Sequence, residues 1–299
     1  MELTPVQRRT LEQLIDREPA ARLPEGFDAV LRERIETAVR ETGLAGDLTL
    51  SKSKLNTLDH CEGAFAADLA GESEPFVHRP ATMVGNLVHK AVELDVGGRE
   101  DVSAHSLAER ASVRLGDEAA FGGAWRGLAP EEQDEVLAEA VRQIELFVAT
   151  FPPLRPLRDR LRPVAEMSVR TELDGGGLLL AGRVDLALSP PSGRVLLDLK
   201  TQDAWPEHAE DMRFYALLAI LRFGVAPSRV ATVYLASGSW QPEDVDESSL
   251  DRAAERVVHG IGAAARARGG KSSALTPGPH CGWCPRRATC PMSAAFPAG

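Results

Sequence analysis

The sequence lacks long apolar runs, and it contains few lysines, aromatic residues and cysteines. No run approaches the roughly 18 apolar residues of a membrane-spanning helix, and the charged N-terminal segment has no apolar core of the kind found in signal peptides. We therefore expect a cytoplasmic protein with no membrane partner. Hydrophobic residues make up 43% and charged residues 26% of the 299 residues, which indicates a globular protein rather than a disordered or fibrous one.

Positive charge is also scarce. Lysine and arginine together number 34 against 44 aspartates and glutamates, so the formal net charge is −10. This balance excludes a protein whose whole surface coats nucleic acid, although local basic surfaces still allow binding, and Arg183 and Arg213 are candidates to face phosphates. Aromatic residues make up only 5% of the chain, so we expect base stacking to contribute little. The chain has only five lysines, so a lysine within a motif is less often there by chance. They are Lys52, Lys54, Lys90, Lys200 and Lys271.

The spacing of apolar residues changes once along the chain. The first half has the 3.6-residue period of amphipathic helices, which are expected over residues 5–17, 27–42, 51–70, 82–95, 104–120 and 130–150. An alternating pattern then predicts strands over 164–173, 178–188 and 194–201, followed by a helix over 206–223, a strand over 229–236 and a helix over 247–267. This order predicts an α/β fold around a mixed sheet flanked by helices. We expect a helical arm over residues 1–48 and one main domain over 49–299.

Two aspartates and a lysine in the predicted hairpin indicate a metal-dependent site. Asp198 and Lys200 lie two apart in one strand, so both side chains point to the same face. The hairpin would bring Asp185, in the preceding strand, close to Asp198. Two carboxylates in an apolar strand pair repel each other unless a cation or a shared proton compensates, and such oxygen ligands suit Mg²⁺ or Mn²⁺. Lys200 could then hold a water and neutralise developing charge, whereas the alternative is an ordinary surface salt bridge.

Three further side chains could complete this site. His89 lies in a predicted helix and its imidazole could bind a metal, while Glu166 opens the first strand of the series and could face the same cavity. Tyr215, one of two tyrosines, lies in the helix after Lys200. The alternatives are a packed helix histidine, an exposed strand glutamate, and a core tyrosine with its hydroxyl at the rim.

The four cysteines are unevenly spaced. Cys281, Cys284 and Cys290 fall close together near the C-terminus, and Cys61 lies 220 residues before the first of them (281 − 61). At this density in a reducing compartment a disulfide framework is not expected. Four thiolates could bind one 4Fe–4S cluster, and a zinc ion is the physical competitor because it also suits four cysteines. One distant cysteine with a three-cysteine cluster, two members of which precede proline, favours an iron–sulfur clasp.

Four motifs, in order, resemble the PD-(D/E)XK nuclease superfamily and in particular its RecB-type exonuclease branch, which includes the AddB nuclease domain and the CRISPR adaptation nucleases. The motifs lie between about residues 50 and 291 and are G-x-x-x-H at Gly85–His89, G-R-V-D at Gly182–Asp185, D-x-K at Asp198–Lys200, and a helix with Tyr215. The same four-cysteine layout occurs in relatives of this branch that carry an iron–sulfur cluster. The resemblance implies a restriction-endonuclease-like fold with an N-terminal helical arm and a C-terminal cysteine clasp.

The resemblance also implies roles for single residues. The divalent metal would be bound by His89, Asp185, Asp198 and the carbonyl of Leu199. Lys200 would be catalytic, and Tyr215 would support the site or contact DNA. One departure is Asp211, because this branch usually has glutamine four residues before the tyrosine.

These features predict a metal-dependent nuclease that hydrolyses single-stranded DNA as an exonuclease, and the resemblance implies a role in DNA repair or recombination. No phosphate-binding loop precedes Gly270-Lys271-Ser272, since Ala265 stands where that loop requires glycine, so any helicase motor would come from another chain. One alternative is an inactive DNA-binding or scaffold module docked on a helicase, against which the set of Asp185, Asp198 and Lys200 argues. The other is a zinc-stabilised protein-interaction domain.

Overall fold

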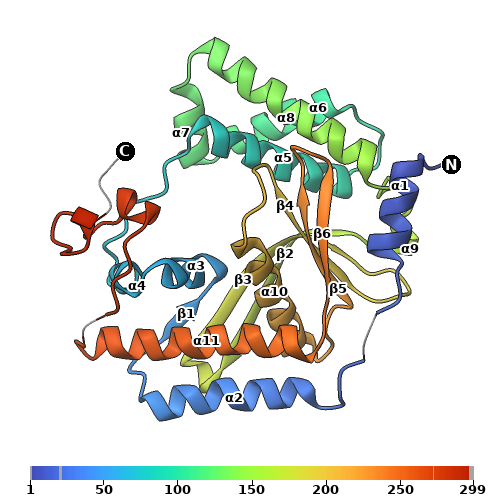
Figure 1. The fold of residues 1–299 in the computed structure, drawn as a ribbon. Coiled ribbons are helices and arrows are strands. Elements are labelled where there is room, and N and C mark those ends of the chain that lie inside the picture. The colour runs from blue at the N-terminus through green and yellow to red at the C-terminus, as the bar shows by residue number, and fades with distance from the viewer. Residues whose placement is uncertain (1, 20–21, 272, 296–299) are drawn as a thin grey trace.

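A mixed sheet of six strands lies between two groups of helices in the computed structural model, which describes residues 2–19, 22–271 and 273–295 (Figure 1). The strands are β1 (Leu48–Leu50), β2 (Val164–Leu173), β3 (Leu178–Leu188), β4 (Val195–Lys200), β5 (Arg229–Tyr234) and β6 (Ser239–Asp244). They follow the order β1-β3-β4-β5-β6, and β2 pairs along the other edge of β3. The β1–β3 and β4–β5 pairs are parallel and the others antiparallel. The mixed α/β architecture expected from the sequence is confirmed.

The helices cover both faces of this sheet. They are α1 (Pro5–Thr10), α2 (Phe27–Thr42), α3 (Lys52–His60), α4 (Glu62–Leu69), α5 (Pro80–Gly97), α6 (Ala104–Gly116), α7 (Ala119–Arg126), α8 (Pro130–Thr150), α9 (Arg158–Leu161), α10 (Glu207–Phe223) and α11 (Glu247–Arg268). Helix α10 packs on one face, with α2 and α11 against it, whereas α5, α6 and α8 form the layer on the other side (Figure 1). A short π-helix (Leu11–Ile15) continues α1, and 3₁₀ turns lie at Asp174–Gly176, Pro279–Trp283 and Ser293–Ala295.

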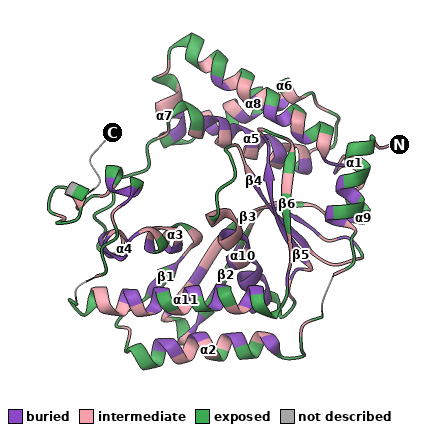
Figure 2. Cartoon of the chain, in the orientation of Figure 1, coloured by how far each residue is buried: buried purple, intermediate pink, exposed green. Residues whose placement is uncertain are grey.

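Strand alternation divides the core into two parts. In β4, Leu196 packs with the α10 layer, while Leu197 and Leu199 pack with the α5 layer. Successive side chains of a strand point to opposite faces, so each layer of helices receives every second residue. Figure 2 shows the result: the central strands β4 and β5 are almost entirely buried, edge strand β6 is intermediate or exposed, and the outer faces of α2, α8 and α11 are exposed. Asp198 therefore shares the α10 face with Leu196.

The structure corrects three expectations about secondary structure. The helix expected over 104–120 ends at Gly116, and a separate helix, α7, follows it. The helix expected over 51–70 is two helices, because Cys61 has an extended backbone (φ −165°, ψ 121°) and separates α3 from α4. Strand β6 was missed, because its sequence is mostly polar and contains Pro242, and it lies at the edge of the sheet, where proline is tolerated. The strands over 164–173 and 178–188 match their predicted bounds.

The N-terminal residues are tied to the sheet by a buried arginine. Arg229 in β5 has no exposed surface, and its Nε donates to Asp244 Oδ1 at 2.6 Å. Its Nη1 donates to the carbonyl of Leu14 at 2.9 Å, beyond the end of α1.

None of the described helices combines the length and the apolar character that a membrane span requires.

Candidate active site

The two acidic motifs meet at one end of the β3–β4 hairpin. Leu186 pairs with Leu197 in the antiparallel register, and Asp185 and Asp198 each lie one position beyond that pair. Asp185 Oδ2 accepts a hydrogen bond of 2.6 Å from the backbone N–H of Leu199. Both carboxylates therefore lie at the same end of the hairpin, as the spacing of the motifs predicted.

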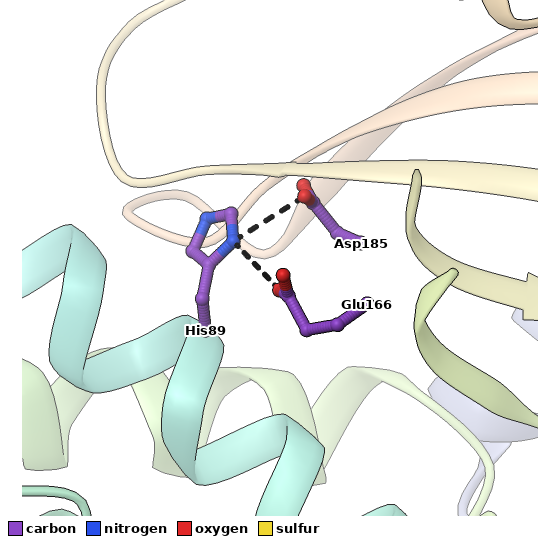
Figure 3. Close-up of side chains that lie close together, drawn as sticks. All are labelled: His89, Glu166 and Asp185. Atoms are coloured by element: carbon purple, nitrogen blue, oxygen red, sulfur yellow. Dashed lines mark ion pairs between the residues drawn. The ribbon is translucent and has the colours of Figure 1, made fainter. Parts of the chain in front are cut away.

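Three side chains from separate elements converge beside this hairpin (Figure 3). His89 comes from α5, Glu166 from β2 and Asp185 from β3, and one ligand atom from each lies within 4.8 Å of the other two. His89 Nδ1 is 3.4 Å from Asp185 Oδ1 and 3.8 Å from Glu166 Oε1. On the other side of the ring, Nε2 lies 2.9 Å from the carbonyl oxygen of Leu199. A carbonyl only accepts, so Nε2 donates, and Nδ1 faces the two carboxylates.

Glu166 reaches this group because its backbone departs from the strand. The β2–β3 pairing includes Ala165 with Leu186 and Met167 with Val184, but it omits Glu166, whose φ is +52°. A side chain other than glycine in the left-handed region costs about 1–3 kcal/mol, and such residues cluster at functional sites. The carboxylate is held by Arg183, whose Nη1 donates to Glu166 Oε2 at 3.1 Å. The sequence placed Glu166 in a strand and gave no sign of this conformation.

Asp198 belongs to a second, adjacent group of four charges. Lys200 Nζ lies 2.6 Å from Asp198 Oδ2, and Lys52 Nζ, from the start of α3, lies 2.9 Å from Asp198 Oδ1. Asp211 Oδ2, from α10, is 3.7 Å from Lys52 Nζ and 4.0 Å from Lys200 Nζ. Two buried aspartates and two partly exposed lysines thus form one electrically balanced group, and we refer to these four residues as the Lys52–Asp211 network.

Tyr215 closes this network on the α10 side. Lys52 Nζ sits 5.1 Å from the centroid of the Tyr215 ring, a cation–π distance. The ring packs against Gly182, where an added Cβ would stand 2.8 Å from Tyr215 Cε1 and 2.9 Å from a Leu218 methyl. The glycine of the G-R-V-D motif therefore leaves the space that brings α10 close to β3.

The pKa values of the charged groups follow from these contacts. Burial alone would lower the pKa of His89, but the carboxylates of Asp185 and Glu166 outweigh it and raise that pKa to about 10. Burial alone would raise the pKa of Asp198, but Lys52 and Lys200 lower it to about 2. Burial raises the pKa of Tyr215, so its hydroxyl stays protonated. The site at neutral pH therefore contains a charged imidazole and a charged Asp198.

Comparison with known proteins identifies the family to which the chain belongs. The family model of the PD-(D/E)XK nuclease superfamily matches residues 49–291. The chain belongs to this superfamily. No curated protein matches the sequence. Among solved structures, the chain is similar to a candidate exonuclease from Eubacterium rectale, with 13% identity, a TM-score of 0.49, and coverage of 94% of this chain and 95% of that one. It is also similar to SSO0001, with 15% identity, a TM-score of 0.31, and coverage of 71% of this chain and 97% of that one.

In this PD-(D/E)XK protein the residues expected at the site fall into two neighbouring groups. His89, Glu166 and Asp185 form the first, which we call the His89 trio, and the Leu199 carbonyl lies beside it. Asp198, Lys200 and Tyr215 lie in or against the Lys52–Asp211 network. Arg183 contacts the trio through Glu166, but Arg213 does not face the site, because its guanidinium pairs with Glu210 and Glu243.

Sequence reasoning missed Lys52. It lies 146 residues from Asp198 in the chain, at the start of a helix that carries none of the four motifs. The available signal was composition, since Lys52 is one of only five lysines.

The four cysteines of the nuclease line one cavity of about 350 Å³. Cys61, at the break between α3 and α4, and Cys281 are buried, whereas Cys284 and Cys290 are half-buried. Two ion pairs hold the segments that carry them: Arg266 Nε donates to Glu62 Oε1 at 2.9 Å, and Arg286 Nη2 donates to Glu72 Oε1 at 2.6 Å. The thiols that are most distant in sequence therefore face a common space.

Proposed function

We propose that this protein is a divalent-metal-dependent nuclease that hydrolyses single-stranded DNA, and that it acts as an exonuclease. The observation that carries the proposal is the His89 trio (His89, Glu166 and Asp185) beside Lys200. An imidazole nitrogen and two carboxylate oxygens come together from three elements, and the ammonium of Lys200 lies against Asp198 at the same end of the hairpin. The nuclease superfamily of the chain supports this use of the site.

The residues present suit a divalent cation. One nitrogen and two hard oxygen donors match the preferences of Mn²⁺ and Mg²⁺. The carboxylates of Asp185 and Glu166 raise the pKa of His89 to about 10, so binding of a cation through Nδ1 would displace the proton that this nitrogen carries. His89, Glu166 and Asp185 would hold the cation, with Asp198 and the Leu199 carbonyl as further candidates. When bound, the cation would polarise the phosphodiester and favour ionisation of a water.

The protein's own side chains would orient the reacting groups. Lys200 is partly exposed and is fixed by Asp198, so its ammonium can donate to a phosphate oxygen or to the attacking water. Asp185 holds the backbone of Leu199 by a 2.6 Å hydrogen bond, which fixes the carbonyl of that residue at the trio. Arg183 is exposed, and while it holds Glu166 its remaining donors can face a phosphate.

A nuclease assay tests this function. Labelled single-stranded and duplex DNA are incubated with the protein in Mn²⁺, in Mg²⁺ or in chelator. We expect metal-dependent cleavage, and loss of cleavage by at least about 100-fold in Asp185→Asn, Asp198→Asn and Lys200→Met with the fold retained. Asp203→Asn and Lys54→Met, two changes of the same chemistry outside the site, serve as matched controls. Cleavage in chelator, or full activity of Asp185→Asn, would show that the assignment is wrong, and binding without any cleavage would favour the inactive scaffold.

We further propose that the four cysteines bind a 4Fe–4S cluster, as in iron–sulfur members of the RecB-type branch. Four thiolates around a cavity of about 350 Å³ suit a cluster, which needs more room than the single ion of a zinc site. Such a cluster would join Cys61 in the first third of the chain to the C-terminal segment. Iron analysis and a broad visible absorbance are expected, whereas a colourless protein with stoichiometric zinc would contradict the proposal.

The cellular setting proposed is DNA repair or recombination. Because the sequence contains no phosphate-binding loop, strand separation would depend on a helicase supplied by another chain. Co-purification with a helicase, and faster cleavage of duplex DNA in its presence with ATP, would support this setting.

A further inference from the structure

A groove connects the active-site pocket with the cysteine segment. It has a volume of about 770 Å³ and is lined by residues of α3, of the segment between α4 and α5, and of the C-terminal segment. Phe76, Thr82 and Gln202 line both this groove and the pocket that contains His89 and Glu166. A chain-like molecule bound at the trio can therefore extend into the groove without leaving the surface.

Exposed aromatic rings are concentrated along this groove. Phe76 is 68% exposed and Trp283 is 73% exposed, and both line it. In a chain with so few aromatic residues, most are buried. The large apolar side chains that are exposed among the described residues include four aromatic ones: Phe76, Trp205, Phe223 and Trp283. Two of these four rings line one groove. Exposed aromatic rings that gather in one place indicate a binding surface, whereas single exposed rings are common on any protein.

The walls of the groove are fixed to each other. Arg286, in the C-terminal segment, donates from Nε and Nη2 to the two oxygens of Glu72 at 2.7 and 2.6 Å. The rings of His60 and His280 stack with centroids 5.6 Å apart and planes 4° from parallel. Figure 1 shows the C-terminal segment beside α4, at the same side of the molecule as the segment that leads to α5. Phe76 and Trp283 thus line the groove from two segments that these contacts hold together.

We propose that this groove binds a single DNA strand beside the catalytic pocket, with unpaired bases stacked on Phe76 and Trp283. This inference rests on the proposed nuclease function for the identity of its ligand. Stacking requires bases with free faces, which a single strand offers and a duplex does not. Arg79 lines the groove and can contact a phosphate, but Asp68 and Glu74 line it too. Affinity should therefore depend more on stacking than on charge, with a shallow salt dependence.

The test measures binding in chelator, so that it does not depend on cleavage. A fluorescent oligothymidine is titrated with the wild-type protein, Phe76→Ala, Trp283→Ala and the double variant. Each single change should weaken binding by about 5- to 150-fold, the range for the loss of one stacked base. An oligonucleotide of the same length with abasic sites should bind the wild type weakly, and the substitutions should not weaken it further. Phe223→Ala, an exposed aromatic on the C-terminal end of α10 away from the groove, should bind oligothymidine like the wild type.

Two controls separate the possible outcomes. Trp283 precedes Cys284, so metal content and visible absorbance are measured in Trp283→Ala, and Trp283→Phe should restore binding if stacking is the cause. Wild-type affinity in the double variant, or equal losses for the abasic strand, would overturn the inference and favour a protein partner for these rings. If the wild type does not cleave DNA but the variants lose DNA binding, the nuclease function is refuted and the DNA-binding groove is supported. If the wild type cleaves DNA but the variants bind it as tightly as the wild type, the groove inference is refuted and the nuclease function is supported.

Discussion

The Lys52–Asp211 network should behave as a charge-balanced unit. Its two ammonium groups and two carboxylates sum to zero, and Asp198 and Asp211 have side chains only 1% and 4% exposed. Lys52→Met removes one positive charge and leaves two buried carboxylates facing Lys200 alone. Asp211→Asn removes one negative charge and leaves two ammonium groups facing Asp198. Each single change therefore creates an uncompensated buried charge, whereas the double change leaves the Asp198–Lys200 pair balanced.

The expected magnitude follows from burial. Removing one partner of a buried ion pair costs about 3–5 kcal/mol, and because the side chain of Lys52 is 28% exposed, we expect about 3 kcal/mol for Lys52→Met. For a chain of this length that corresponds to a thermal midpoint lower by roughly 5 °C. The two single changes should not add: the double variant should be more stable than their sum by about 1–3 kcal/mol.

The assay is a thermal double-mutant cycle at a fixed scan rate, with cleavage of single-stranded DNA as a second measurement. Lys54→Met is the matched control, because Lys54 lies on the same helix and its Nζ is 4.0 Å from Asp68, outside the network. Cleavage should fall in each single variant and recover in part in the double variant, since Lys200 and Asp198 are again paired. Strict additivity, or a Lys52→Met protein as stable as Lys54→Met, would refute the reasoning.

Three other changes test separate parts of the structure. Cys61→Ser should lose the visible absorbance and become more sensitive to proteolysis across the nuclease domain, because the proposed cluster joins distant segments; full iron content in this variant would show that other ligands are used. His89→Ala should lower cleavage only partly, since water can replace one neutral ligand, and rate measurements at saturating Mn²⁺ check this; an unchanged rate would place His89 outside the site. Arg229→Met should destabilise the protein by about 3 kcal/mol, because it leaves Asp244 and the carbonyl of Leu14 without their buried donor, and a thermal midpoint equal to the wild type would contradict that account.

Regular elements were predictable where one pattern dominated. The strands over 164–173 and 178–188 are bounded by glycine and proline, and the helix expected over 130–150 matches α8 in its bounds. The break at Cys61 was not predictable, because the residues on both sides continue a helical pattern and only the extended backbone of one residue interrupts it. Edge strand β6 carries polar residues that read as a loop.

The site was predictable only to the extent that its residues are neighbours in one hairpin. Asp185 and Asp198 lie at the same end of the β3–β4 hairpin because the strand register follows from the turn, which is a local property. Glu166 reaches His89 through a positive φ, and no sequence pattern at that position calls for one. The sequence therefore identified the candidate residues, but it left open which of them would bind the same metal ion.

Asp211 shows why long-range contacts change the interpretation of a motif. In the branch that the motifs resemble, this position usually holds a neutral glutamine. In the structure the acid lies 3.7 Å from Lys52, a residue 159 positions earlier in the chain (211 − 52), and Lys52 also pairs with Asp198. A neutral amide would need no such counter-charge, whereas a buried carboxylate does. The acid at position 211 and the lysine at position 52 thus compensate each other's charge, and the role of neither follows from its own motif alone.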